Sequence, residues 1–295
     1  MVTNFLKYLS FEKRSSQHTI TAYEEDLKQL QEFLSETFEI EDHSEVRHTH
    51  LRNWIIHLME NEMSPVSINR KIACLKSYFK FLLSREYVET NPASRLRPLK
   101  TEKRLPSFVK STEMEELLSL PVFKGDSLPE CRDRLIIELL YGTGMRLSEL
   151  LGLKNTDINF FDQSIKVLGK RNKERVIPIT SFVVELIKKY NNLAMEKWGT
   201  ITGESALIRT DQGKPVYPMF IYRTVKKYIG EVSTLTKRSP HVLRHTFATH
   251  LLDKGADLNA VKELLGHTSL AATQVYTHNS LEKLKSAFDQ AHPRA

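Results

Sequence analysis

The stretch SPHVLRHTFATH, residues 239–250, holds the densest group of side chains suited to chemistry. His241 and Arg244 are three residues apart, so on a helix they share one face. Two further histidines, His245 and His250, raise the alternative of a zinc site. A metalloprotease helix carries its two histidines at a four-residue spacing with a glutamate base between them, and no glutamate lies in this stretch. We therefore expect neither a metal nor a cofactor.

Four other side chains have types that fit chemistry on a phosphodiester. Arg146 follows a Gly-X-Gly turn that leaves room for a ligand near the backbone, and Lys170 lies in the turn of a predicted hairpin. His267 follows a helix that ends at a glycine, and Tyr276 comes nine residues later. Each alone has an ordinary structural explanation, such as a surface cation or a core tyrosine. Together with the pair described above, they form a set suited to phosphoryl transfer.

Phosphoryl transfer explains why these residue types belong together. A phosphodiester under attack gathers negative charge on its non-bridging oxygens, which arginine binds through paired hydrogen bonds while keeping its own charge. Nearby cations favour the phenolate of a tyrosine, which makes it a nucleophile. A lysine or histidine can then protonate the leaving alkoxide. No acidic cluster for Mg²⁺ stands out in the sequence, which disfavours a carboxylate-and-metal transposase.

In order and spacing, these motifs resemble the tyrosine recombinases of the phage-integrase superfamily, and within it the bacterial Xer recombinases. The resemblance covers nearly the whole chain. The catalytic boxes and the lysine hairpin of that family are matched by GTGMRLSELLGL, LGKRNKERVIPI, HVLRHTFATHLL and LLGHTSLAATQVYTH. The family's core-binding domain is matched by Ser16, Thr19, Tyr23, Asp26 and Leu27, by INRKIACLKSYFKFL, and by the triplet Asn91, Pro92 and Ala93.

The resemblance implies which residues act as the nucleophile and as the general acid. Tyr276 is expected to be the nucleophile that joins covalently to the 3′ phosphate and releases a 5′ hydroxyl. Lys170 is expected to be the acid that protonates that 5′ oxygen. The chain departs from the family pattern at Arg171, where these hairpins commonly have glycine before Asn172. This arginine either adds a phosphate contact or alters the turn, and it leaves Lys170 in the same role.

The resemblance also implies how the phosphate is held. Arg146 and Arg244 are expected to bind the scissile phosphate, and Glu149 occupies the acidic position that supports Arg146. His241 and His267 are expected to hydrogen-bond the phosphate and to assist proton movement.

The elements that position these residues are mostly helical. The sequence contains no glycine before Gly125, which favours helices joined by short turns over a sheet rich in tight hairpins. Ser64 and Pro65 form a suitable cap and first turn for one helix. Apolar residues recur at helical spacing in 20–34, 51–58, 68–82 and 130–141. Two β-branched runs, 164–169 and 174–180, flank four polar residues and predict a hairpin. We predict a mainly α-helical protein with a small antiparallel sheet.

The resemblance implies two domains that close as a C-shaped clamp around duplex DNA. Residues 1–97 are expected to form a helical, SAM-like core-binding domain, and residues 109–295 the catalytic domain. Residues 98–108 contain two prolines and no periodicity, as an interdomain linker does. The final stretch, 280–295, is expected to form a helix that docks onto a neighbouring protomer, with docking onto its own core as the alternative.

Charge is unevenly distributed along the chain. The net charge is +7, but the first 62 residues carry −6 and residues 63–104 carry +7. This asymmetry favours a polyanion bound on one face. On the helix that begins at Pro65, Arg70, Lys76 and Lys80 lie off the apolar stripe and are predicted DNA contacts; a merely solvated surface is the alternative.

The remaining expectations concern compartment, partners and competing functions. Two cysteines, no apolar span and no secretion signal predict a cytoplasmic protein without membrane association. The resemblance implies strand exchange by a homo- or hetero-tetramer on two double-stranded DNA sites. The biological role would be chromosome dimer resolution during cell division, with a septal DNA translocase as a further partner, or recombination of a mobile element. The alternatives are a type IB topoisomerase-like relaxing enzyme and a non-catalytic DNA-binding protein.

Overall fold

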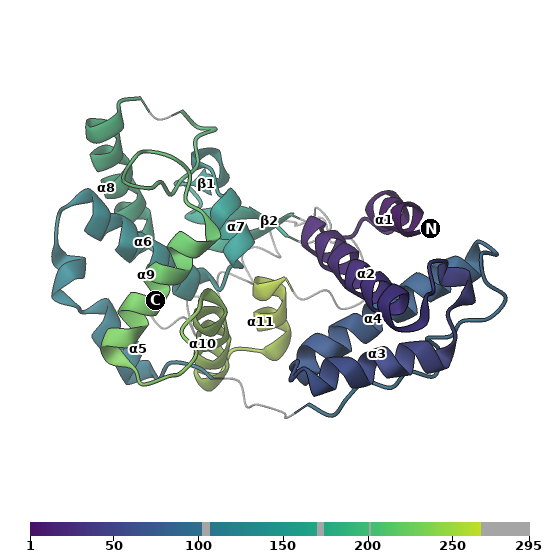
Figure 1. Ribbon diagram of the computed structural model, residues 1–295. Helices are drawn as coiled ribbons and strands as arrows, with labels where there is room; N and C mark the ends of the chain where they lie inside the picture. The colour runs from purple at the N-terminus through teal and green to yellow at the C-terminus, as the bar shows by residue number, and fades with distance from the viewer. Residues whose placement is uncertain (102–106, 170–173, 201, 267–295) are drawn as a thin grey trace. The chain divides into compact units, whose positions relative to one another are not determined.

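The computed structural model describes residues 1–101, 107–169, 174–200 and 202–266 (Figure 1). The chain divides into two compact units, Met1–Arg104 and Leu105–Ala295, here called the N-terminal and C-terminal units. Lys170, Arg171, His267 and Tyr276 lie outside the described residues, as does the predicted helix in 280–295. Across the part of the chain that the structure describes, no helix is long and apolar enough to cross a membrane.

The N-terminal unit is a set of packed helices. Its elements are α1 (Val2–Phe11), α2 (Gln17–Phe38), the 3₁₀ turn η1 (His43–Glu45), α3 (His48–Glu60) and α4 (Pro65–Ser84). Helix α4 begins as predicted, because the Ser64 hydroxyl accepts the backbone N–H of Ser67 and proline occupies the first turn. Its predicted apolar stripe, from Ile68 to Leu82, is buried throughout. Helix α1 was not predicted, since only Phe5 and Leu9 of its ten residues are buried.

Polar side chains also tie α2 to α4. The Asp26 carboxylate is fully buried and accepts hydrogen bonds from the guanidinium group of Arg70 and, at 2.7 Å, from Lys71 Nζ. Lys71 is itself buried and lies 5.5 Å from the centre of the Trp54 ring. A buried charge is costly unless it is paired, so this cluster fixes the two helices against each other.

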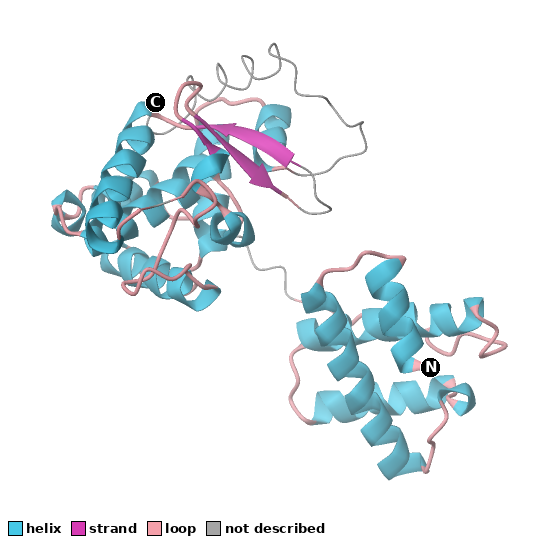
Figure 2. Cartoon of the chain, turned by 90° about the horizontal axis from the view of Figure 1, so that it is seen from above, coloured by secondary structure: helices cyan, strands magenta, loops and turns pink. Residues whose placement is uncertain are grey.

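The C-terminal unit is a helical body with a three-stranded antiparallel sheet at one edge (Figure 2). Its helices are α5 (Ser111–Leu118), α6 (Leu128–Thr143), α7 (Leu147–Gly152), α8 (Ser181–Trp198), α9 (Pro218–Val232), α10 (Pro240–Asp253) and α11 (Leu258–Leu265), with 3₁₀ turns η2 (Pro121–Lys124) and η3 (Asn155–Asp157). Its strands are β1 (Ile158–Asn159), β2 (Ser164–Leu168) and β3 (Glu174–Pro178). The mainly α fold and the β2–β3 hairpin confirm the sequence prediction. Strands β2 and β3 are each shorter than the predicted runs, and β1, α8 and α9 were not predicted.

Helix α6 forms the centre of the C-terminal unit, because its second half is buried on every side. It ends at Gly144, whose φ of 60° lies in the left-handed region. A Cβ at this position would meet Cδ1 of Phe247 at 2.4 Å, so glycine is required for space as well as for conformation. The resulting sharp turn directs the chain from α6 into α7, and Arg146 lies at that junction.

Candidate active site

Arg146 is the residue that caps the N-terminus of α7. Its backbone N–H donates to Oε2 of Glu149 at 2.7 Å, and its Nη1 donates to Oε1 of the same carboxylate at 2.9 Å. Its Nη2 donates to the carbonyl oxygen of Gly266 at 3.1 Å. The Arg146 side chain nevertheless keeps 30% of its surface exposed. The guanidinium group is therefore oriented by the protein and still open to a ligand.

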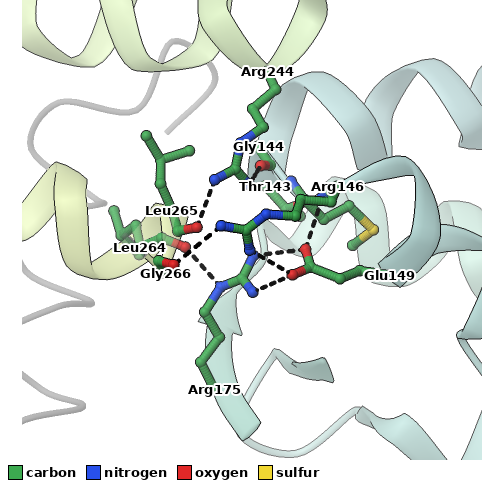
Figure 3. Close-up of polar contacts among 10 residues, drawn as sticks. Thr143, Gly144, Arg146, Glu149, Arg175, Arg244, Leu264, Leu265 and Gly266 are labelled. Carbon is green, nitrogen blue, oxygen red and sulfur yellow. Dashed lines mark hydrogen bonds and ion pairs between the residues drawn. The ribbon is translucent and has the colours of Figure 1, made fainter. Parts of the chain in front are cut away.

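Arg244 approaches the same place from α10. Its Nη1 donates to the carbonyl oxygen of Gly144, and its Nη2 donates to that of Leu265 at 2.6 Å (Figure 3). Burial, together with the positive charges of Arg146 and Arg175, lowers the pKa of Arg244 to about 10, against the opposing effect of Glu149. The group stays protonated at neutral pH, but its charge is destabilised and would be favoured by a bound anion.

Glu149 is the carboxylate that pairs with Arg146, and it is almost completely buried, with 1% of its side chain exposed. A second arginine, Arg175 on β3, donates Nη1 to Oε1 at 2.6 Å and Nη2 to Oε2 at 2.8 Å of this carboxylate (Figure 3). Burial by itself raises the pKa of Glu149, but the hydrogen bonds and charge of Arg175, joined by the contacts from Arg146, outweigh it and lower the pKa overall. Glu149 is thus a carboxylate at physiological pH.

The C-terminal end of α11 joins the three arginines. Three successive backbone carbonyls there each accept a hydrogen bond from a different guanidinium group. The bonds run from Arg175 to Leu264 (2.9 Å), from Arg244 to Leu265 (2.6 Å) and from Arg146 to Gly266 (3.1 Å). Carbonyls at a helix C-terminus have no partner within the helix and carry partial negative charge, so they attract cations. They orient these cations without cancelling the charge, and an excess of positive charge remains.

Gly266 makes this convergence possible. It ends α11 with a φ of 63°, and a Cβ there would lie 3.2 Å from Cδ and Nη1 of Arg175. A larger residue would therefore strain the turn and push on the buried arginine. His267 follows directly in the sequence.

Of the four predicted catalytic and supporting residues that the structure describes, it brings three together: Arg146, Glu149 and Arg244. His241 is exposed on α10, three residues before Arg244. His250, on the same helix, is buried, and its Nδ1 is hydrogen-bonded to the Tyr141 hydroxyl at 2.9 Å. Within the described ranges, no group of three or more His, Cys, Asp or Glu side chains is placed to hold a metal ion.

Sequence reasoning missed Arg175. The signal that reveals it is the alternation of strand β3, in which Arg175 and Ile177 both face inward. A cation at an inward-facing strand position requires a buried partner, and Glu149 is that partner.

The three predicted DNA contacts of the N-terminal unit differ in their surroundings. The guanidinium group of Arg70 is exposed but bonded to Asp26 and to the carbonyl oxygen of Ala22. Lys76 is half-buried on α4, and Lys80 is exposed. A contact of these residues with DNA stays a prediction.

Comparison with known proteins identifies the class to which this fold and site belong. The model of the phage integrase family matches residues 108–283, and that of the phage integrase N-terminal SAM-like domain matches residues 2–86. The chain therefore belongs to the phage integrase family.

Its curated relatives narrow the class further. Tyrosine recombinase XerC of Listeria innocua serovar 6a is 40% identical, over 99% of this chain and 97% of that protein. Tyrosine recombinase XerC of Natranaerobius thermophilus is 37% identical, over 99% and 98%. The protein is a tyrosine-type, Xer-like site-specific DNA recombinase.

Solved structures share the fold. XerH site-specific recombinase bound to palindromic difH substrate, in a post-cleavage complex, aligns with a TM-score of 0.72 and 23% identity, over 97% of this chain and 84% of that one. A lambda integrase dimer bound to a COC′ core site aligns with a TM-score of 0.66 and 18% identity, over 93% and 98%.

Proposed function

We propose that the arginine cluster of the C-terminal unit binds the scissile phosphate of a double-stranded DNA site and that Tyr276 attacks it. In this step the Tyr276 hydroxyl gives its proton to a histidine of the site, its oxygen forms a bond to phosphorus, and the bond from phosphorus to the 5′ oxygen breaks. The enzyme is left joined to the 3′ phosphate, and Lys170 gives its proton to the 5′ oxygen. Attack by a 5′ hydroxyl of the partner strand reverses the reaction and completes the exchange.

Arg146 and Arg244 neutralise the charge that develops on the phosphate oxygens. The observation that supports this role is their convergence: each is fixed by a backbone carbonyl at the end of α11, so neither needs to reorganise when the phosphate binds. Glu149 orients Arg146, while His241 and His267 hydrogen-bond the phosphate and help to move protons. No step requires a metal ion.

The N-terminal unit supplies the second DNA contact in this proposal. Residues 1–97 form the core-binding domain, residues 98–108 the linker, and residues 109–295 the catalytic domain with its C-terminal exchange helix. Lys76 and Lys80 on α4 contact the DNA backbone, and Arg70 adds to this surface through the part of its side chain that remains exposed.

Strand exchange requires two cleaved sites held together, so the proposed active form is a tetramer on two DNA sites. The partner protomers are copies of this chain or a related recombinase, and the exchange helix joins neighbours. The similarity to proteins named XerC supports a role in chromosome dimer resolution and partition at cell division, with recombination of a mobile element as the alternative role. A septal DNA translocase is a further proposed partner. The site of action is then the cytoplasm.

The experiment that tests this function uses a nicked suicide duplex, which traps a cleaved intermediate because the leaving fragment diffuses away. Wild-type protein is expected to give a covalent protein–DNA adduct on a denaturing gel. Tyr276→Phe is expected to bind the duplex equally well and to give no adduct, because only the nucleophilic oxygen is lost. Tyr217→Phe, which alters an exposed tyrosine at the start of α9, is the matched control. An adduct with Tyr276→Phe would overturn the assignment.

A further inference from the structure

Arg175 is a buried cation that the proposed chemistry does not use. Its side chain is 6% exposed, and three of its N–H donors are bonded to Glu149 and to the carbonyl oxygen of Leu264. Because its guanidinium group is enclosed by these contacts, Arg175 has no path to a DNA phosphate. Burying a cation is costly even when it is paired, so the burial of Arg175 next to Arg146 and Arg244 requires an explanation.

The hydrogen-bond pattern of Glu149 supplies that explanation. Arg175 faces this carboxylate with both Nη atoms, one on each oxygen, which is the strongest arrangement an arginine can make. Arg146 consequently has only one side-chain bond to Glu149, from Nη1 to Oε1, and its Nη2 turns to the carbonyl of Gly266. Of the five N–H donors of the Arg146 guanidinium group, the contacts among described residues use two, so the others stay available to an anion.

Removing Arg175 would change what Glu149 does. Oε1 would keep its bond from the Arg146 side chain, and Oε2, which accepts the Arg146 backbone N–H, would have room for a second hydrogen bond. A two-bonded side-chain pair between Glu149 and Arg146 would then form. That pair would neutralise Arg146 and draw its donors inward, away from the phosphate. In a simple ion pair, the carboxylate both orients the arginine and cancels its charge. Because Arg175 occupies Glu149, this carboxylate orients Arg146 without neutralising it.

Arg175 also connects elements that are distant in the sequence. Its strand, β3, is joined to α7 through Glu149 and to the end of α11 through Leu264. The same turn of α11 supplies the carbonyls that hold Arg244 and Arg146. One buried side chain thus fixes the supports of both phosphate-binding arginines.

We propose that Arg175 is a positioning residue for phosphate binding, which occupies Glu149 with both guanidinium nitrogens so that Arg146 keeps its charge and donors for the scissile phosphate. The proposal rests on the proposed function. It extends that function to a residue that makes no contact with DNA.

The test is single-turnover cleavage of the nicked suicide duplex by full-length protein at saturating DNA. Arg175→Lys keeps the charge but loses the fork, and we expect its cleavage rate to fall about 10- to 100-fold with DNA affinity within about twofold of wild type. Arg175→Met, which releases Glu149 altogether, is expected to lose about 10²-fold or more. Lys166→Met is the matched control, because Lys166 is an exposed cation on the same hairpin that forms an ion pair with exposed Glu174.

A double variant separates positioning from a merely structural role. In Arg175→Met/Glu149→Gln no carboxylate remains to draw Arg146 inward, so we expect cleavage at least about 10-fold faster than in Arg175→Met alone. Rates are normalised to the folded fraction, measured by circular dichroism at the assay temperature. The proposal is overturned if Arg175→Lys cleaves within threefold of wild type, if the loss in Arg175→Met equals its loss of folded protein, or if the double variant is no faster than Arg175→Met. Failure of wild-type protein and Lys166→Met to form any adduct would instead overturn the proposed function.

Discussion

Each unit of the protein contains a buried carboxylate that pairs with two cationic side chains, and the two clusters differ in what they leave for a ligand. In the N-terminal unit, Asp26 pairs with Arg70 and with Lys71, which is itself buried. In the C-terminal unit, Glu149 pairs with Arg175 and Arg146. In the N-terminal cluster the carbonyl oxygen of Ala22 also accepts a hydrogen bond from Arg70. In the C-terminal cluster three successive carbonyls at the end of α11 each hold a different arginine, and a third cation joins the pair.

This difference separates a structural charge cluster from a functional one. A carboxylate holds a cation and cancels its charge, whereas a carbonyl dipole holds it and cancels little. The Asp26 cluster therefore joins α2 to α4, and its removal should affect stability. The arginine cluster keeps an excess of positive charge at a partly exposed place, and its removal should affect chemistry. The predictions below test this contrast.

Among changes to the two clusters, the largest effect is expected from Arg244. Arg244→Ala removes one of the two arginines that we propose to bind the phosphate, and we expect the rate of cleavage to fall about 10²-fold or more. Arg244→Lys should recover little, because an ammonium group cannot make paired hydrogen bonds to phosphate oxygens. Suicide-substrate cleavage measures both, with Arg223→Ala on an exposed position of α9 as the control. A near-wild-type rate with lysine would contradict the phosphate-binding role.

Replacing Asp26 is expected to lower the stability of the protein without lowering the rate of DNA cleavage per folded molecule. Asp26→Ala leaves Lys71 buried without its carboxylate, so the free energy of unfolding should fall by about 3–5 kcal/mol. Glu12→Gln, which breaks an exposed pair with Arg85, should cost about 1 kcal/mol or less. Urea unfolding followed by circular dichroism measures both changes. An unchanged midpoint for Asp26→Ala would show that the cluster does not support the fold.

These two clusters also show what could be predicted from the sequence. Helix α4 was predicted from its apolar spacing and its Ser64–Pro65 start, because both features are local. Arg70 was predicted only as a DNA contact, and its bond to Asp26 was missed because that bond joins residues far apart in the chain. Arg175 was missed for the same reason: its partner lies on a different element.

In the candidate active site too, local spacing predicted some features and only the family resemblance implied the others. Spacing alone placed His241 and Arg244 on one helix, as the structure confirms. The convergence of Arg146 with Arg244 was implied only by the family resemblance, because it depends on how α6, α10 and α11 pack. The roles of Lys170, His267 and Tyr276 rest on that resemblance, and they stay predictions.

A smaller effect, confined to DNA affinity, is expected from α4. If Lys76 and Lys80 contact phosphates, replacing both with alanine should flatten the plot of log affinity against log salt by about two units, since each contact releases about 0.9 counterion. Binding should weaken on specific and scrambled duplexes alike. Lys7→Ala/Lys13→Ala, at exposed positions in the same unit, is the control. Unchanged affinity and slope would show that this face of α4 is only solvated.

No effect on cleavage is expected from removing divalent metal ions. In the proposed mechanism the arginine cluster supplies the charge stabilisation that Mg²⁺ supplies in other phosphoryl-transfer enzymes. Cleavage of the suicide duplex in excess EDTA should proceed at a rate within about twofold of that in Mg²⁺. A complete loss that Mg²⁺ restores would contradict the proposed mechanism.

The contrast between the clusters is tested most directly by neutralising each buried carboxylate with its amide and comparing cleavage. For Glu149→Gln we predict a cleavage rate lower by about 10-fold or more, with DNA affinity retained, because the support of Arg146 is weakened. For Asp26→Asn we predict a lower free energy of unfolding but a normal cleavage rate per folded molecule. Equal cleavage by the two variants, once corrected for folded fraction, would contradict the account.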